Sequence, residues 1–577
     1  MRIQEMPMLK DFFKKYGWNY IPGAILMITC AYVQTRSPIA LGKAIELATQ
    51  GDWQAFLHQT LMILWIALGV FATRFGWRWF VVRTSREMEV YLRDRLYAHL
   101  VNLPVGFFGH SRSGDLMAYA INDVNAVRMM FGMVVAQVVN SLSSVLFSVG
   151  QMSGAIHARL TLYSLLPIPL AIVAVVLLGR KIRVRARRAQ DLFSKLSGHV
   201  QENINGMRVL KAFAQENPQY AEYEAESEEK RRANILWYNT GALMDPLIKT
   251  VFAVSYAVGL IYGGQLVLDQ VIFLSEYVAF NSYLTMIVFP VIAIGRITNN
   301  LQRGMASYKR LKELMDIPEV PLFDRTDDKS EIGAGIEARH LTYRYADADS
   351  PALSDISFTI RPGGMLGIVG PTGGGKTTAL SLITKLLVPE PGTLFIGGRD
   401  ITEIPAVTLR NAIGYVPQDG FLFDESIREN VRFFADATDE DVKRMLDISG
   451  MTGDLEKMPD GLETLCGERG NHLSGGQRQR VSLARALVRN PKILLLDDTL
   501  SAVDTRTEGR ILKNLRENMA GRTSVVIAHR LSAGKDADEI LFVEDGRIVE
   551  RGTHDELLAL GGGYAHMYGL QNKKEDA

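Results

Sequence analysis

Long apolar stretches dominate the first half of the chain, and each is long enough to cross a bilayer as a helix, which takes about 20 residues. They lie at residues 18–48, 59–83, 127–153, 157–180, 241–265 and 272–298. Residues 134–151 and 160–178 contain no charged side chain, and the core of a soluble protein rarely supplies two such runs side by side. The pattern therefore predicts an α-helical transmembrane domain with six spanning helices.

The polar connections between these stretches predict how the domain lies in the membrane. Residues 83–125 and 180–237 are long, polar and helical in period, whereas the connections near Gly51, His157 and Leu266 are short. The second long connection opens with six basic side chains, Arg180, Lys181, Arg183, Arg185, Arg187 and Arg188. Because basic residues next to spans stay cytoplasmic, we expect both long connections and both termini to be cytoplasmic in a multi-pass cell-membrane protein.

The N-terminus resembles a signal peptide only superficially. Its first 15 residues are basic and precede an apolar run, but that run continues towards Ala48 without a small-residue cleavage site. We expect residues 9–20 to form an amphipathic helix that contacts membrane lipid ahead of the first span.

The pattern changes after residue 316. Residues 317–335 are polar and contain Pro318, Pro321 and Gly333, as a linker between domains would. Beyond it, short apolar strands alternate with helical patterns, as in residues 492–497 followed by 506–518. This alternation predicts a transmembrane domain over residues 1–316 and an α/β domain over residues 336–577.

Composition narrows the class of protein further. A chain of 577 residues is too long for one core, and a mean hydropathy of +0.05 fits the average of two unlike halves. With 64 Lys and Arg against 63 Asp and Glu, no bulk charge attracts nucleic acid. The only cysteines, Cys30 and Cys466, fall in different predicted domains, so we expect no disulfide.

A glycine-rich segment in the second half carries the clearest chemistry. Gly370-Pro-Thr-Gly-Gly-Gly-Lys376-Thr377 follows a predicted strand at 365–369 and opens a predicted helix, which is the context of a phosphate-binding P-loop. Glycines let backbone N–H groups approach the phosphates, Lys376 brings a positive charge, and the Thr377 hydroxyl can bind Mg²⁺. The predicted contacts to ATP in and after this loop are Gly370, Thr372, Gly373, Gly375, Lys376, Thr377 and Thr378.

A second segment supplies the carboxylate that a magnesium site needs. Residues 493–497 form an apolar run that ends in Asp497, as a buried parallel strand would. Ligands bind at the carboxyl ends of such strands, so Asp497 is predicted to join Thr377 in holding Mg²⁺.

Further motifs identify the family that this sequence resembles. Leu473-Ser474-Gly475-Gly476-Gln477 is similar to the signature of ATP-binding cassette (ABC) proteins, and residues 107–116 and 206–213 look like the two coupling regions of multidrug-type exporters. The resemblance covers nearly the whole chain. It also assigns single residues: Tyr345 as the aromatic that stacks on adenine, Gln418 as the Q-loop glutamine that contacts Mg²⁺, residues 501–504 as the D-loop, and His529 as the switch histidine.

The resemblance implies that a single chain cannot complete an ATP site. In the family, the signature of one subunit covers the γ-phosphate of ATP bound to the other, so we expect a second half-transporter as partner. Asp498, His529 and Gln418 would form the catalytic set. The expected activity is ATP-driven efflux of hydrophobic or amphipathic compounds.

One position departs from the family pattern. The residue after the magnesium-binding aspartate is normally a glutamate that polarises the attacking water, and here it is Asp498. Aspartate is shorter by about 1.5 Å, and a misplacement of about 1 Å can slow a reaction on the order of a hundredfold. In related heterodimeric exporters, one chain combines such a carboxylate with an intact signature. We therefore expect one half of a heterodimer whose own site hydrolyses ATP slowly.

Other functions stay open at this point. A soluble cassette ATPase acting on DNA or ribosomes is opposed by the spans, while an ATP-gated channel, a lipid or peptide exporter, and a slow homodimeric exporter share this architecture. Methionine and aromatic side chains in the spans suit varied apolar substrates, although such faces more often pack between helices. Arg74 and Arg78 in the second span are expected to face a cavity or an interface.

Overall fold

The computed structural model describes residues 7–319, 331–345, 348–499, 505–518, 521–528, 531 and 534–575. The chain divides into two compact units: one comprises Met1–Val101 and Ser111–Pro318, the other Asn102–His110 and Glu319–Ala577. The boundary between Pro318 and Glu319 falls inside the predicted linker, residues 317–335. The second unit also includes the short helix α5 (Val105–His110), which the sequence pattern grouped with the membrane domain.

The first unit contains helices joined by short connections, and no strand among its described residues. Its elements are α1 (Pro7–Tyr16), η2 (Gly17–Asn19), α2 (Tyr20–Gln34), α3 (Arg36–Gln50), α4 (Trp53–Val101), α6 (Ser113–Ala118), η3 (Tyr119–Asp123), α7 (Val124–Met129), η4 (Met130–Val134), α8 (Val135–Gln151), η5 (Met152–His157), α9 (Ala158–Leu165), α10 (Ile168–Asn205), α11 (Met207–Ala212), α12 (Glu216–Ala242), α13 (Met244–Leu268) and α14 (Leu274–Met315). The long polar connections are helical as predicted, because α4, α10 and α12 extend far beyond the apolar stretches.

Five helical stretches among the described residues are long and apolar enough to cross a membrane. They are Met8–Gln50, Trp53–Val101, Ser113–Leu165, Glu216–Leu268 and Leu274–Met315. The expected count of six is therefore not confirmed. The predicted stretch 157–180 is interrupted at Leu166 and Pro167, so its apolar residues are shared between α9 and the start of α10. Proline lacks the N–H that a continuous helix needs at this point.

The amphipathic helix α1 turns its apolar face towards protein. Leu9 and Phe12 are fully buried, the Phe12 ring lies 5.5 Å from that of Tyr91 on α4, and the Tyr91 hydroxyl donates to the Met8 carbonyl at 3.3 Å. An amphipathic pattern requires an apolar surface to pack on, and the C-terminal part of α4 supplies part of it.

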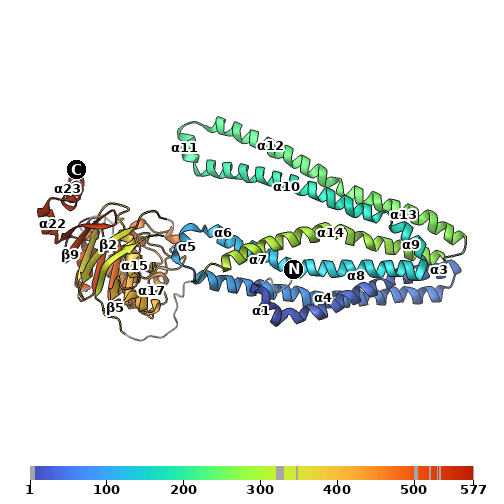
Figure 1. Cartoon of the computed structure of the whole chain (residues 1–577), viewed down its shortest axis with the longest axis horizontal. Helices are drawn as coiled ribbons and strands as arrows, with labels where there is room; N and C mark the ends of the chain where they lie inside the picture. The colour runs from blue at the N-terminus through green and yellow to red at the C-terminus, as the bar shows by residue number, and fades with distance from the viewer. Residues whose placement is uncertain are drawn as a thin grey trace. The chain divides into compact units, whose positions relative to one another are not determined.

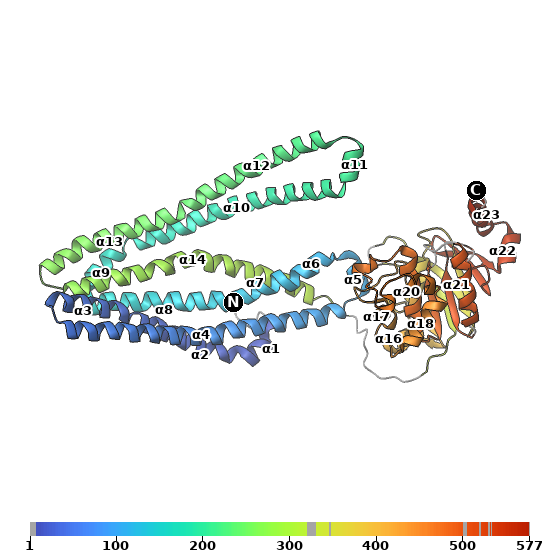
Figure 2. The same ribbon diagram turned by 180° about the vertical axis from the view of Figure 1, so that it is seen from behind.

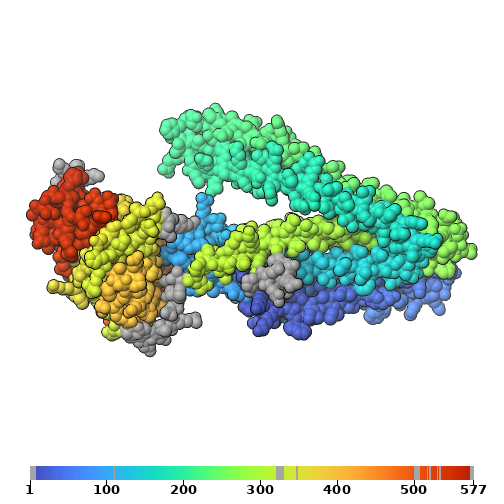
Figure 3. Space-filling model, viewed as in Figure 1, coloured from blue at the N-terminus to red at the C-terminus, as the bar shows by residue number. Residues whose placement is uncertain are grey.

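The remaining helices form a bundle and a long hairpin. Helix α14 packs against α3, α7 and α8, and α2 packs against α4 and α8. Asp123, buried at the end of η3, accepts a hydrogen bond from Ser307 and pairs with Arg310, both on α14. Helices α10 and α12 lie side by side and are joined by α11 (Figure 1; Figure 2). An open space separates the outer part of this hairpin from α14 (Figure 3).

The second unit contains two sheets. A four-stranded antiparallel sheet has the order β2-β1-β4-β5, and a six-stranded sheet has the order β10-β9-β3-β8-β7-β6. The strands are β1 (Ile336–Tyr343), β2 (Leu353–Ile360), β3 (Met365–Val369), β4 (Leu394–Ile396), β5 (Arg399–Asp400), β6 (Ile413–Val416), β7 (Ile493–Asp497), β8 (Thr523–Ile527), β9 (Glu539–Glu544) and β10 (Arg547–Gly552). Apart from the β9–β10 pair, the six-stranded sheet is parallel. The predicted strands 365–369 and 493–497 are therefore confirmed as β3 and β7.

Helices surround these sheets and complete the α/β fold. They are α15 (Lys376–Ile383), η6 (Ile401–Glu403), α16 (Ala406–Ala412), α17 (Ile427–Arg432), α18 (Asp439–Ile448), α19 (Thr452–Leu455), η7 (Gly461–Glu463), η8 (Glu468–Gly470), α20 (Gly475–Val488), α21 (Thr505–Asn518), α22 (His554–Leu560) and α23 (Gly563–Glu575). Two clusters of buried apolar side chains fill the unit, and the strands β3, β7 and β8 contribute to both. Because both faces of these strands are buried, their sequences are continuous apolar runs.

Candidate nucleotide site

The parallel register brings several predicted site residues to one edge of the six-stranded sheet. Ile368 of β3 and Asp497 of β7 both pair with Ile527 of β8, and Val416 of β6 pairs with Leu496. The loops that leave the carboxyl ends of β3, β6 and β7 therefore start at the same level, which is where open parallel sheets bind ligands.

The P-loop has a shape that only glycine permits at two positions. Gly375 caps α15 in the left-handed region at φ 93°, and a Cβ there would collide with the Ala352 carbonyl oxygen. Gly370 has φ 146°, and a Cβ would collide with the Val543 carbonyl oxygen. Glycine relieves both conflicts. The loop thus delivers the chain to the first turn of α15, whose N–H groups are suited to bind an anion.

Lys376 lies inside this loop. Its Nζ donates to the carbonyl oxygens of Gly370 at 2.9 Å and Pro371 at 2.7 Å, and the residue is only 6% exposed. Burial lowers the pKa of this ammonium group, and the negative charges of Asp497 and Asp498 oppose that shift. The positive charge is therefore held at the point where the loop would surround the phosphates.

Thr377 and Asp497 meet although they are far apart in sequence. The Thr377 hydroxyl donates to Asp497 Oδ1 at 3.3 Å, and Asp497 is 2% exposed at the end of β7. A hydroxyl and a carboxylate are the hard oxygen ligands that Mg²⁺ prefers, so the donor set fits this cation. Gln418 follows β6 on the same edge and is exposed.

Tyr345 lies beside the start of α15. Its hydroxyl is 3.2 Å from that of Thr378, and its ring lies 5.3 Å from the Tyr343 ring in an edge-on arrangement. The residue is 38% exposed, which leaves ring surface free to stack on a base. Thr372 and Gly373 are exposed in the P-loop.

Asp498 directly follows Asp497 and is 8% exposed. Its N–H donates to the Ile527 carbonyl at 3.0 Å, and its backbone is left-handed at φ 46°. Aspartate tolerates this conformation better than most residues with a side chain. The backbone thus fixes where this carboxylate starts, beside the predicted magnesium ligands.

The signature segment forms the N-terminus of α20. Ser474 caps α20: its Oγ accepts the Gln477 N–H at 3.3 Å, and its own N–H donates to Gln477 Oε1 at 2.9 Å. Leu473 is buried, Ser474 is exposed, and Gly475, Gly476 and Gln477 are half-buried. Among the described residues, no hydrogen bond or ion pair joins Ser474 or Gln477 to the P-loop.

Asp454 is a supporting residue that the sequence reasoning missed. Its Oδ1 accepts from Gln477 Nε2 at 3.0 Å, and its Oδ2 pairs with Arg480 at 2.7 Å. A serine followed three residues later by glutamine, as in Ser474 and Gln477, is the sequence pattern of a helix capping box. Asp454 is distant in sequence, and no local pattern indicates its contact with them. The predicted switch residue His529 and the D-loop 501–504 lie outside the described residues.

A nucleotide-binding α/β unit, joined to a unit of long apolar helices, defines an ATP-driven membrane transporter. The chain belongs to the ABC transporter family: residues 21–291 match the profile "ABC transporter transmembrane region" and residues 353–501 match the profile "ABC transporter". It is an integral membrane protein that binds ATP and couples ATP hydrolysis to transport.

Curated relatives match over nearly the full length. The probable multidrug resistance ABC transporter ATP-binding/permease protein YheI of Bacillus subtilis is 37% identical, over 97% of this chain and 96% of the relative. The multidrug resistance-like ATP-binding protein MdlA of Escherichia coli is 34% identical, over 98% and 96%. An ATP-dependent lipid A-core flippase of Syntrophus aciditrophicus is 32% identical, over 84% and 80%.

A solved structure has the same fold. The structure of a bacterial Atm1-family ABC exporter with ATP bound superimposes with a TM-score of 0.74 at 25% identity, covering 97% of this chain and 99% of that one. The resemblance to ABC exporters inferred from the motifs is therefore confirmed.

Proposed function

We propose that the chain is one half of a heterodimeric exporter that moves hydrophobic or amphipathic compounds across the cell membrane. The observation that carries the heterodimer is Asp498, in the position where the family has a catalytic glutamate, combined with an intact signature at Leu473–Gln477. The chain's own ATP site would be slow, and its signature would complete the partner's fast site.

The geometry supports this division of labour. Asp498 starts from a fixed backbone position, with its N–H bonded to Ile527, so the side chain reaches about 1.5 Å less far than a glutamate would. A water placed for glutamate is then badly oriented, at a cost on the order of a hundredfold. Ser474, exposed at the N-terminus of α20, is free to contact a phosphate bound elsewhere.

The proposed ATP site uses residues from both chains. In this chain Tyr345 stacks on adenine, the P-loop residues Gly370 to Thr378 bind the phosphates, and Asp498, His529 and Gln418 orient the attacking water. Thr377, Asp497 and Gln418 would hold Mg²⁺, which neutralises phosphate charge when bound. The partner's signature would close the site.

Coupling to the membrane unit follows from chain connectivity. The chain leaves the first unit at Val101, contributes Asn102–His110 to the second unit, and returns at Ser111. A closure of two cassettes around ATP would therefore act directly on α4 and α6, as well as through the segment near residues 214–220. The proposed orientation keeps the cassette and both termini cytoplasmic, with six spans.

The test is to purify the chain alone and together with a candidate partner half-transporter, and to measure ATPase activity in detergent or nanodiscs. We expect low turnover by the chain alone and fast turnover by the pair. Robust turnover by the chain alone, abolished by Asp498→Asn, would instead identify a homodimeric exporter and overturn the heterodimer.

A lipid is the second candidate substrate, because a lipid A-core flippase is among the relatives. Dye efflux from cells expressing both chains would support drug-like compounds. Movement of labelled lipid in proteoliposomes without dye efflux would support the lipid candidate. An ATP-dependent ion conductance without vectorial transport would contradict both.

A further inference from the structure

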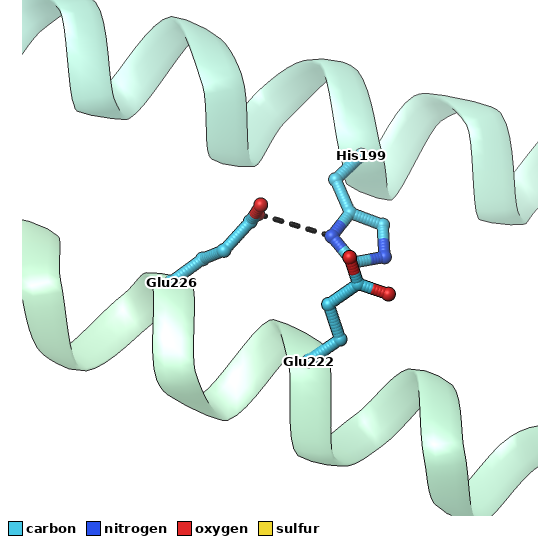
Figure 4. Close-up of side chains that lie close together, drawn as sticks. All are labelled: His199, Glu222 and Glu226. Atoms are coloured by element: carbon cyan, nitrogen blue, oxygen red, sulfur yellow. Dashed lines mark hydrogen bonds and ion pairs between the residues drawn. The ribbon is translucent and has the colours of Figure 1, made fainter.

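A second cluster of chemically active side chains lies in the first unit, on the hairpin formed by α10 and α12. His199 belongs to α10, whereas Glu222 and Glu226 belong to α12. The two glutamates are four positions apart, which places them on one face of their helix. All three side chains point towards one another across the gap between the helices (Figure 4).

The distances suit a bound metal ion. One ligand atom from each side chain lies within 4.8 Å of the others, and His199 Nδ1 is 3.0 Å from Glu226 Oε2. Ligand atoms about 2.1 Å from a Zn²⁺ ion lie about 3 to 4 Å apart, so small rotamer changes close the site. Imidazole nitrogen with carboxylate oxygen is a ligand set that Zn²⁺ and related transition metals prefer over Mg²⁺.

Neighbouring groups orient the ligands. His199 Nε2 lies 2.9 Å from Gln219 Oε1 and can donate its proton there, which leaves Nδ1 as the atom that faces the carboxylates. A metal-bound histidine usually has such an acceptor on its other nitrogen. Lys195 Nζ holds Glu226 Oε1 at 3.0 Å and leaves Oε2 towards His199.

Glu226 is shared between two neighbouring groups. One carboxylate oxygen lies 3.0 Å from Lys195 Nζ, and the other lies 3.0 Å from His199 Nδ1. A metal ion would therefore bind in competition with a proton on His199 Nδ1. His199 and Glu226 are each 13% exposed, whereas Glu222 is exposed, so an ion can enter on the Glu222 side.

We propose that the α10–α12 hairpin binds one divalent transition-metal ion of the Zn²⁺ class through His199, Glu222 and Glu226, with water completing the coordination. The ion would link the two helices near α11 and so fix the end of the hairpin. This site is separate from the proposed magnesium site of the cassette, and it does not depend on the identity of the transported compound.

The test uses the purified full-length chain with a tag that contains no histidine, treated with a chelator and kept free of nucleotide. Co²⁺ serves as the probe because its visible absorption reports the coordination of a Zn²⁺ site. We expect one Co²⁺ per chain, displaced by Zn²⁺. Glu226→Gln and Glu222→Gln, which keep side-chain volume, should each weaken binding at least tenfold, and His199→Ala should abolish it.

Two further variants make the result specific. Gln219→Ala removes only the group that orients His199, and we expect about a tenfold loss of affinity. Glu224→Gln alters a glutamate of α12 that lies on another face, and it should bind Co²⁺ as the wild type does. Zn²⁺ should raise the unfolding temperature of the wild type and of Glu224→Gln, but not of Glu226→Gln.

Two outcomes would contradict the proposed metal site. If Co²⁺ does not change the spectrum of the wild type, a proton shared between His199 and Glu226 accounts for the cluster. If Glu222→Gln and Glu226→Gln bind Co²⁺ as tightly as the wild type, the ion lies elsewhere on the chain.

Discussion

The P-loop and the signature segment are expected to bind phosphate groups of ATP, but the chain builds them in opposite ways. The P-loop encloses its lysine: carbonyl oxygens crowd Gly370 and Gly375, and Lys376 is buried among them, while Thr372 and Gly373 stay exposed. The signature is open, with Ser474 exposed at the start of α20. This contrast fits the proposal that the enclosed region binds ATP within one chain, whereas the open region meets a phosphate held by another chain.

The largest effect is expected from Lys376→Ala, which breaks the enclosed side. The variant removes a buried charge that would contact the phosphates, and charged hydrogen bonds contribute about 1.5 to 3 kcal/mol each. We expect the affinity of this chain for a fluorescent ATP analogue to fall on the order of a hundredfold. Lys443→Ala, which changes an exposed lysine on α18, is the matched control. An unchanged affinity in Lys376→Ala would contradict the assigned role.

Asp498→Glu tests whether the reach of the carboxylate limits hydrolysis on the enclosed side. If reach is the defect, the longer carboxylate should raise turnover at this chain's own site by up to about a hundredfold. The left-handed backbone at φ 46° favours aspartate, so a loss of about 1 kcal/mol in stability is expected as well. Single-turnover hydrolysis in a pair whose partner site has been inactivated measures the change. No gain in rate would show that the slow step lies elsewhere.

Ser474→Asp breaks the open side without damaging the helix. Aspartate keeps a capping oxygen for the Gln477 N–H, but its charge repels the phosphate that the segment should cover. We expect hydrolysis by the pair to fall about tenfold, with the unfolding temperature and the ATP affinity of this chain's P-loop unchanged. Ser474→Ala, by contrast, removes the capping oxygen and should lower the stability of the fold by about 1 kcal/mol. Equal activity of wild type and Ser474→Asp would show that Ser474 faces no phosphate.

The smallest effect is expected from Asp454→Asn, which loosens the support of the open side. Burial raises the pKa of Asp454, but the hydrogen bond from Gln477 and the charge of Arg480 lower it below its usual value overall. Losing the ion pair should cost about 0.5 to 1 kcal/mol at neutral pH, seen as a small drop in unfolding temperature.

The pH dependence of that cost has a definite sign. A carboxylate with a lowered pKa stabilises the fold above its ordinary value of about 3.9 and loses this contribution as pH falls through the lowered value. The difference between wild type and Asp454→Asn should therefore vanish in acid. A difference that persists there would point to packing instead.

The sequence allowed the cassette to be predicted closely because its chemistry is local. The strands 365–369 and 493–497 are apolar runs bounded by polar or glycine residues, and they match β3 and β7. The P-loop glycines and the capping pair Ser474 and Gln477 are contiguous or nearly so. Asp454 could not be predicted, because its contact with Gln477 exists only after folding.

The membrane unit was predicted less well for physical reasons. Hydropathy measures how apolar a stretch is, and it does not report whether the stretch is one helix, so the break at Pro167 was missed. It also does not distinguish lipid from protein as the environment of an apolar face. Hydropathy alone therefore could not predict that Leu9 and Phe12 of α1 are buried against protein. Arg74 and Arg78 are exposed in the single chain, and the expectation that they face a cavity or an interface stays a prediction.

The unbroken length of α4 has a mechanical consequence. At 49 residues it forms one rod of about 70 Å, since each residue of a helix adds about 1.5 Å. A stiff rod acts as a lever: a tilt of about 5° about one end displaces the other end by about 6 Å. Because Val101 is where the chain passes into the nucleotide-binding unit, a small rotation there would be amplified at Trp53, the far end of the same helix.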